Sequence, residues 1–538
     1  MSAPRGVRRR LLRVVLYTAA VAFIVTAAVA AWLVLRFQPI ARQYFISTLQ
    51  KRYQSDIELG DLQISLYPTV RASGGNLVFW FQGRHDLPPL VQIRRFSFEA
   101  GFFNFFRNPK HINRLRLEGL QIHVPPRSDH SSQASPPVSA STSASAATSA
   151  FSSNTTAFVL DEVNADGATL EVAPRDPAKN PLTFDIARLT LRTVAAGRPM
   201  AFHAELTNPK PPGLIQSDGR FGPWNAARPV DTTLYGNYTF RNADLSVFKG
   251  ITGKLSSDGR YNGQLGRLEV QGSTDVPDFA LTTGGHPMAL HTDYEATVDG
   301  TNGNTVLHPV HARLGRTGFE VSGSIERNSD ATPLDTHKTI LLEAKTAAGT
   351  SARIEDFLRL AVKGPNPPMS GSIRFDAKVK VPPGTTEVID RLQLDGTFGL
   401  GGVRFASSDV QGKIASLSHR AQGDPNNHDP GVTADFQGVF HLQGGQLSLP
   451  DLRFTVPGAN VSLHGTYALR SGAIDFQGTA KLDATVSQMT TGFKSKLLKP
   501  FDPFFRRDGA GTVLPVTIRG TRGEPSFRLD IGRVLRRD

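Results

Sequence analysis

The chain has 538 residues, no cysteine and a formal net charge of +13 at pH 7. The lack of cysteine excludes disulfides, thiolate metal sites and cysteine nucleophiles. The 50 glycines and 36 prolines are spread along the chain, which predicts many tight turns between short strands.

The amino terminus predicts a membrane anchor. Arginines at positions 5, 8, 9, 10 and 13 precede residues 14–35, which carry no charge, and Arg36 follows them. Because about 20 apolar residues span a bilayer as a helix, we expect a transmembrane anchor at 14–36. The basic tail at 1–13 is then cytoplasmic, and the bulk of the chain lies on the other side of the membrane. A cleaved signal peptide is the alternative, since Ala28-Val29-Ala30 resembles a cleavage site, but its apolar region would be about 7–15 residues long.

Three segments follow the anchor. Residues 37–126 begin with a possible helix at 39–54 and continue as alternating strands, which indicates a small αβ unit. Residues 127–156 are rich in Ser, Ala and Pro, cannot bury a core, and are predicted to be a disordered linker or insertion. Residues 157–538 alternate throughout as a repeated β region. Glycine-x-aromatic steps at 236–238, 259–261, 396–398, 438–440 and 465–467 suggest a loosely repeated hairpin unit.

Helix signals are few in the long β region. The clearest is 351–363, where Ile354, Phe357, Leu358 and Ala361 share one face and Gly364-Pro365 end the pattern. A second is 487–499, with Met489, Phe493 and Leu497 aligned. Two short helices cannot cover a sheet of many strands.

Residues 446–476 show the alternation most clearly. Polar side chains separate the apolar ones, so we expect short strands with one apolar face. Reversals are predicted at Pro450, Pro457-Gly458 and Ser471-Gly472. The predicted apolar face consists of Leu447, Leu449, Leu452, Phe454, Val456, Val461, Leu463, Tyr467, Leu469, Ile474 and Phe476. Another sheet, helices or something that is not protein must cover this face. Because the predicted helices are too few, either a second sheet covers it, as in a sandwich, or lipid does.

The segment 494–507 mixes aromatic and basic side chains. Such a mixture suits a lipid headgroup surface or a partner protein, and a cap on the end of the sheet is the alternative. The predicted membrane-surface contact consists of Phe501, Phe504, Phe505, Lys494, Lys496, Lys499, Arg506 and Arg507.

Several segments resemble the AsmA family of bacterial envelope proteins, within the TamB-like, bridge-like lipid transfer group. At the amino end these are 56–79 (DIELGDLQISLYPTVRASGGNLVF), 90–103 and 112–124. At the carboxyl end they are 436–482 and 511–531. The middle of the chain matches in style only, and the Ser/Ala segment departs from the family pattern.

The resemblance implies a long antiparallel sheet curled into a groove, apolar inside and polar outside, with a few short helices. It further implies a single-pass protein of the bacterial inner membrane, held by residues 14–36, with the bulk of the chain in the periplasm. The implied cargo is phospholipid, and the implied role is outer membrane lipid homeostasis and assembly. Outer-membrane or envelope proteins at the carboxyl-terminal end are a further class of partner.

No catalytic or cofactor-binding constellation is present in the sequence, so we expect neither an enzyme nor a cofactor or metal site. His308 and His311 are the nearest to a metal pair, but positions three apart on a strand face opposite ways. Asp424, His428 and Asp429 fall in a turn-rich loop and are read as solvated. Basic residues form no long stripe, which disfavours nucleic acid as a partner.

Two alternatives to lipid transport remain. A scaffold or assembly factor would affect the targeting of outer-membrane proteins through strand addition at its sheet edges. A glycan-binding β-domain would carry carboxylates on its concave face, and no such set is evident.

Overall fold

The computed structural model describes residues 43, 56–65, 69–80, 88–89, 91–101, 110–124, 158–172, 182–195, 197–223, 229–248, 250–282, 284–300, 303–327, 338–350, 352–384, 386, 388–491, 499–505, 509, 511–521 and 524–529. The predicted tail at 1–13, anchor at 14–36 and linker at 127–156 lie outside these ranges. Across the ranges just given, no helix combines the length and apolar character needed to cross a membrane.

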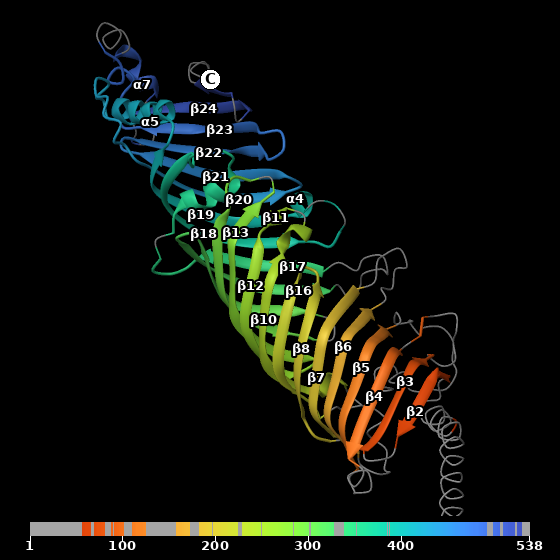
Figure 1. The fold of residues 1–538 in the computed structure, drawn as a ribbon. Coiled ribbons are helices and arrows are strands. Elements are labelled where there is room, and N and C mark those ends of the chain that lie inside the picture. Colours follow the sequence, from red (N-terminus) through yellow and green to blue (C-terminus); the bar gives the residue numbers. More distant parts are fainter. Residues whose placement is uncertain are drawn as a thin grey trace, which may run out of the picture. The chain divides into compact units, whose positions relative to one another are not determined.

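The chain divides into two compact units, and the predicted β class is confirmed in both (Figure 1). The first unit runs to Thr207 and also contains Asp218–Pro229, and the second contains Asn208–Ser217 and everything from Val230 onward. The two units therefore do not divide at the predicted linker, 127–156. That this linker is disordered stays a prediction.

The first unit is built from consecutive strands. Its strands are β1 (Ile57–Glu58), β2 (Asp61–Ser65), β3 (Thr69–Phe79), β4 (Val91–Gly101), β5 (Lys110–Val124), β6 (Phe158–Val172), β7 (Leu182–Ala195) and β8 (Met200–Pro209), the last two residues of which fall in the second unit. Pairing is antiparallel from β1 to β5 and from β6 to β8.

Strands β5 and β6 pair in parallel, with Lys110 opposite Phe158 and Val124 opposite Val172. A parallel pair needs a crossover of about a dozen residues or more, whereas an antiparallel pair can be joined by a tight turn. The Ser/Ala segment between these strands thus allows the chain to return before it pairs again. The sheet continues directly from the amino-terminal strands into the region that follows the segment.

The second unit is a single run of antiparallel pairs after strand β9 (Pro212–Phe221). Its strands are β10 (Thr233–Asp244), β11 (Ile251–Thr252), β12 (Lys254–Gln264), β13 (Arg267–Leu281), β14 (Met288–Val298), β15 (Thr305–Leu314), β16 (Thr317–Arg327), β17 (Lys338–Thr346), β18 (Met369–Val381), β19 (Gln393–Phe405), β20 (Ala434–Gln443), β21 (Gln446–Val456), β22 (Ala459–Ala468), β23 (Ala473–Leu482), β24 (Thr512–Thr521) and β25 (Pro525–Leu529). From β12 to β25 each strand pairs with the next, which builds one sheet rather than two.

Three of the four α-helices described in this unit lie at one end of the strands. Because consecutive strands are antiparallel, the connections β17–β18, β19–β20 and β23–β24 fall at the same rim. They contain α3 (Ile354–Ala361), α5 (Ser408–Ala421) and α7 (Asp502–Phe505), so we call this end the helical rim. The opposite end, the turn rim, holds the β20–β21 and β22–β23 turns and the short α4 (Val388–Arg391). One-turn helices at Pro229–Asp231, Leu245–Val247 and Lys499–Phe501 complete the described helical structure.

Helix α3 confirms the helix predicted at 351–363. The Phe357 ring lies 6.1 Å from that of Phe319 and 5.5 Å from that of Phe375, centroid to centroid, so α3 packs on the apolar side of β16 and β18. The Asp356 carboxylate, 4% exposed, accepts from the Thr317 hydroxyl at 2.9 Å and from the Arg316 backbone N–H at 3.1 Å. Burial of apolar rings together with a satisfied buried carboxylate fixes α3 at the rim.

The repeated glycine-x-aromatic steps have a structural cause. Residues two apart face the same side of a strand, and the register sets each glycine opposite a neighbouring aromatic residue. Gly396 pairs with Phe440 and Phe398 pairs with Gly438. A Cβ on Gly396 would lie 2.8 Å from the Phe440 ring, so the aromatic ring occupies the space above the glycine. The predicted hairpin repeat is thus a reciprocal packing of rings over glycines.

Candidate functional site

Strands β21, β22 and β23 carry ten of the eleven residues of the predicted apolar face. The register places Leu452 opposite Leu463 and Phe454 opposite Val461. It also places Tyr467 between Leu447 on β21 and Ile474 on β23. Intervening residues such as Arg453, Ser462 and Asp475 are exposed. The alternation in the sequence therefore does correspond to one apolar and one polar face.

One predicted reversal in this segment is wrong, and one residue of the predicted face lies outside the strands. Pro450 does not reverse the chain, because β21 runs without a break from Gln446 to Val456. Instead, the pairing of β21 with β22 shifts between Leu449 and Leu452, a bulge that keeps Leu447 and Leu452 on the same face despite their odd spacing. Leu469 follows the end of β22 and lies in a turn, where its N–H donates to the Gly445 carbonyl at 2.9 Å.

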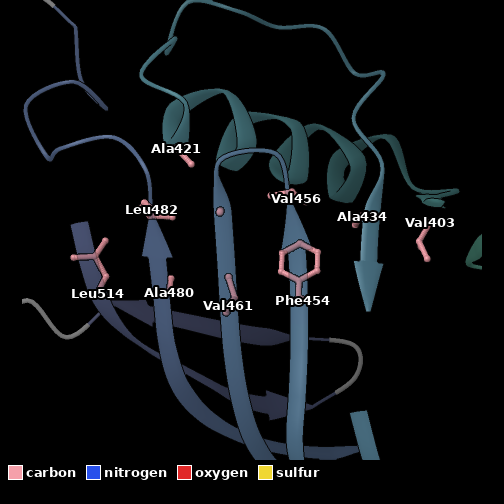
Figure 2. Packing of buried hydrophobic residues seen from close by; sticks show 10 residues of the cluster. Val403, Ala421, Ala434, Phe454, Val456, Val461, Ala480, Leu482 and Leu514 are labelled. Carbon is pink, nitrogen blue, oxygen red and sulfur yellow. The ribbon is translucent and has the colours of Figure 1, made fainter. Parts of the chain in front are cut away.

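Protein covers the part of this face nearest the helical rim. Phe454, Val456 and Val461 are 8%, 3% and 7% exposed. They form a core with Ala421 of helix α5, against which Ile414 and Leu417 of the same helix also pack. Figure 2 shows α5 lying across the ends of these strands, above Val456 and Leu482. The sequence predicts too few helices to cover the sheet, and for this part of the face that expectation is wrong, since α5 covers it.

Hydrogen bonds fasten α5 to the strand ends. The Ser418 hydroxyl donates to the Pro457 carbonyl at 2.7 Å, and the Ala484 backbone N–H donates to the Ala421 carbonyl at 2.7 Å. Gly458 adopts a φ of +80°, and a Cβ there would lie 2.7 Å from Cγ of Gln422. Only glycine suits this turn, because both the backbone conformation and the space exclude a side chain.

Toward the turn rim the same face is half-buried and lies outside the α5 core. We call this part the open strip: Leu447, Leu449, Tyr467, Ile474 and Phe476. Leu452 and Leu463 lie between the open strip and the core. Phe476 covers Gly465, where a Cβ would approach the Phe476 ring to 2.7 Å, so its ring lies close to the sheet.

The opposite face of the second unit is polar and charge-paired. Arg519 and Asp475 join β24 to β23 at 3.1 Å, Lys378 and Glu343 join β18 to β17 at 3.5 Å, and His441 and Asp395 join β20 to β19 at 2.6 Å. Exposed pairs of this kind contribute little to stability. They mark this face as the one that contacts water.

The predicted membrane-surface contact is described only in part. Phe501 ends a one-turn helix, and Phe504 and Phe505 belong to α7. Lys499 is exposed. Lys494, Lys496, Arg506 and Arg507 lie outside the described residues. The Asp502 carboxylate accepts from the Ser487 N–H at 2.9 Å and from the Ser487 hydroxyl at 2.7 Å, which ties α7 to the turn at 486–489 that follows β23.

The two histidines considered in the sequence lie on the same face of β15, contrary to the expectation that they face opposite ways. His308 and His311 are both exposed on the polar face, because a register shift between Leu307 and Val310 replaces the expected alternation. His308 Nε2 lies 2.9 Å from the Thr297 hydroxyl, and His311 Nδ1 lies 3.8 Å from a Glu320 carboxylate oxygen. In the described part of the chain, no group of three His, Cys, Asp or Glu side chains could hold a metal ion.

The loop at 423–431 is ordered by its own hydrogen bonds. The Asp429 side chain accepts from the Gly431 N–H at 2.9 Å, and its carbonyl lies 2.9 Å from Nε2 of His419, which is 8% exposed. The Asp424 backbone N–H donates to the His419 carbonyl. These contacts hold the loop that connects α5 to β20.

Sequence reasoning missed helix α5, although a signal was present. Ser407 caps the helix by accepting from the Val410 N–H, and Ile414, Leu417 and Ala421 recur at helical spacing. The polar residues between them dilute the pattern. The helix predicted at 487–499 lies mostly outside the described residues; of its described part, 487–489 belong to a turn and Lys499 begins a one-turn helix.

In comparisons with protein-family models, with curated proteins and with solved structures, no match to this chain is found.

Proposed function

We propose that the chain binds phospholipid by its acyl chains on the apolar face of the second unit and carries or conducts it along that face. The open strip is the observation that carries this proposal. It consists of apolar side chains that are neither fully buried nor part of the α5 core, on a sheet whose other face is polar.

The energetics favour an acyl chain as the cover. Burying each CH₂ group stabilises a bound chain by about 0.8 kcal/mol, and a sheet face offers such burial without a polar pocket. The Phe476 ring lies over Gly465 and so stays close to the sheet. An open apolar strip suits a flexible apolar chain better than a rigid polar ligand.

The helices at the helical rim determine from which side the proposed ligand can reach the apolar face. Helix α5 occupies the face at the ends of β21 and β22, and α3 occupies it at β16 and β18. An acyl chain therefore reaches the face from the turn rim.

The cellular setting rests on the resemblance to the AsmA family. The proposal places residues 14–36 in the bacterial inner membrane, the bulk of the chain in the periplasm, and the role in phospholipid supply to the outer membrane. The groove shape of the whole sheet belongs to the same proposal.

A lipid-transfer assay tests the proposal. The full chain, reconstituted in donor liposomes, should move a fluorescent phospholipid to acceptor liposomes. Replacing Leu449 and Ile474 together by Asp should slow transfer by about tenfold or more, because two charges then face the acyl chain. Ser462→Asp, on the exposed face of β22, is the matched control and should transfer like the parent. A parent protein that moves no lipid would contradict the proposal and favour the scaffold alternative.

A further inference from the structure

The apolar face of the second unit is interrupted by a cluster of hydroxyl groups. It spans strands β9 to β14 and contains two hydrogen-bonded groups, Ser217 with Tyr261 and Ser257 with Tyr238, Thr274 and Tyr294. Its members are Ser217, Tyr238, Ser257, Tyr261, Thr274 and Tyr294. Ser217 and Ser257 are 9% and 5% exposed, whereas Tyr238 and Tyr294 are half-buried. The tyrosine side chains therefore form the accessible surface of the cluster.

Two glycines make the central arrangement possible. Gly259 and Gly272 pair on β12 and β13, with Tyr238 opposite Gly259 and Tyr294 opposite Gly272. A Cβ on Gly259 would lie 2.7 Å from Cε1 of Tyr238, and one on Gly272 would lie 3.0 Å from the Tyr294 hydroxyl. The two tyrosines thus lean toward each other over the glycines until their hydroxyl groups meet. We call this pair the tyrosine bridge.

Apolar residues lie on both sides of the bridge. One row toward the turn rim, Val270 pairs with Ala296, which is 4% exposed. Toward the helical rim, Val276 pairs with Leu290 and is 2% exposed. The bridge and the adjacent Thr274–Thr292 row therefore form a polar band between apolar residues on this face, which is where an amphiphile would place its polar group.

Counting hydroxyl protons shows which one is available. The Ser257 hydroxyl donates to the Ser273 carbonyl at 2.8 Å and accepts from Thr274 at 3.3 Å. Its second lone pair can accept from only one of the two tyrosines, Tyr294 at 3.2 Å or Tyr238 at 3.3 Å. The hydroxyl of the other tyrosine then donates its proton to the oxygen of the first tyrosine.

That remaining proton can turn to an oxygen of a ligand without leaving another donor of the cluster unpaired. Burial raises the pKa of the Tyr238 hydroxyl, so the group keeps its proton and stays a donor at neutral pH.

We propose that the tyrosine bridge binds the carboxylate or ester oxygen at the polar end of an acyl chain lying on this face. The inference rests on the proposed function, because it concerns the same apolar face and the same class of ligand. It adds that the face holds its ligand at a fixed place and in one orientation, rather than at any point along the strands.

Photolabelling of the full chain in detergent micelles tests the inference. One palmitic acid probe carries a diazirine next to the carboxyl group, and a second carries it at the methyl end. Labelled peptides are mapped by mass spectrometry in the parent, in the Tyr238→Phe/Tyr294→Phe variant and in Tyr235→Phe. Tyr235 is the matched control, since it lies on the same strand, is 41% exposed and points to the other face.

The carboxyl-end probe should label β10 and β12–β14 of the parent. Labelling of the double variant at these strands should be about fivefold lower, as expected for one lost hydrogen bond. Labelling by the methyl-end probe and the thermal unfolding midpoint should stay as in the parent, because both rings remain. Equal labelling by the carboxyl-end probe in parent and double variant would overturn the bridge assignment alone. No labelling of the apolar face by either probe would overturn the proposed function as well.

Discussion

The Ser418 hydroxyl donates a 2.7 Å hydrogen bond to the Pro457 carbonyl, and this bond joins the last turn of helix α5 to the β21–β22 turn. Ser418 is 0% exposed. The helix is thereby held over the buried end of an apolar face whose other end stays open. The proposed ligand site, the open strip, begins where helix α5 no longer covers the apolar face.

Removal of this bond should loosen the helix. Ser418→Ala leaves the Pro457 carbonyl with only a 3.4 Å contact from the Gln422 side chain, and we expect a loss of about 1 kcal/mol in the free energy of unfolding. Denaturant unfolding measures the loss, and hydrogen exchange should quicken at Gly458 and Ala459. Ser416→Ala, on the same helix, is the control. An equal effect of both variants would show that the bond does not hold the helix.

The covered and open parts of the apolar face should respond differently to charge. Phe454→Asp places a carboxylate in the α5 core and should cost about 3 kcal/mol or more of stability. Leu449→Asp, in the open strip, should cost about 1 kcal/mol or less, because water reaches the new group. Thermal unfolding of the two variants compares them. Similar losses at both positions would mean that protein covers the open strip too.

Glycines beneath the aromatic rings should not tolerate a methyl group. A Cβ on Gly465 would lie 2.2 Å from the Asp475 carbonyl oxygen, so Gly465→Ala should destabilise the unit by about 1–3 kcal/mol. Gly412 in α5 has nothing within 4 Å of a built Cβ, and Gly412→Ala should stabilise by about 0.5–1 kcal/mol. Opposite signs in denaturant unfolding are the expected result, and matching signs would refute the ring-over-glycine account.

One histidine on the polar face should make stability depend on pH. A hydrogen bond to Asp275 at 2.6 Å raises the pKa of His291, and Asp293 adds to the effect at 3.4 Å. The stabilisation by protonated His291 is therefore complete below the pKa of the unfolded state, about 6.5. It is lost as pH rises through the higher pKa of the folded state. The stability difference between the parent and His291→Gln should thus be larger at low pH. In Asp275→Asn this dependence should weaken, and a difference that grew with rising pH would contradict the assignment.

The fold was predictable where alternation is local, and less so where it depends on long-range contacts. Phe454 and Val461 fall on one face because strand geometry sets their direction, and the tight turns were marked by Pro457-Gly458 and Ser471-Gly472. The bulge near Pro450 was read as a reversal, because a proline inside a strand and a proline in a turn leave similar sequence signals.

The cover over Phe454 could not be predicted from the strand itself. It comes from α5, more than thirty residues earlier, whose apolar face is narrow. The tyrosine bridge could not be predicted from the sequence either. It depends on the register that sets Gly259 opposite Gly272 on two strands. The parallel pairing of β5 with β6 was also hidden, since the Ser/Ala segment carries no pattern of its own.

Mass spectrometry of the lipids that copurify with the full chain tests the central claim most directly. The account predicts phospholipid in about stoichiometric amount with the parent and with Ser462→Asp. It also predicts loss of that lipid from a folded Leu449→Asp/Ile474→Asp variant, because charges in the open strip expose the acyl chain to water. Equal lipid in all three proteins, or none in the parent, would contradict a lipid-binding role for the open strip.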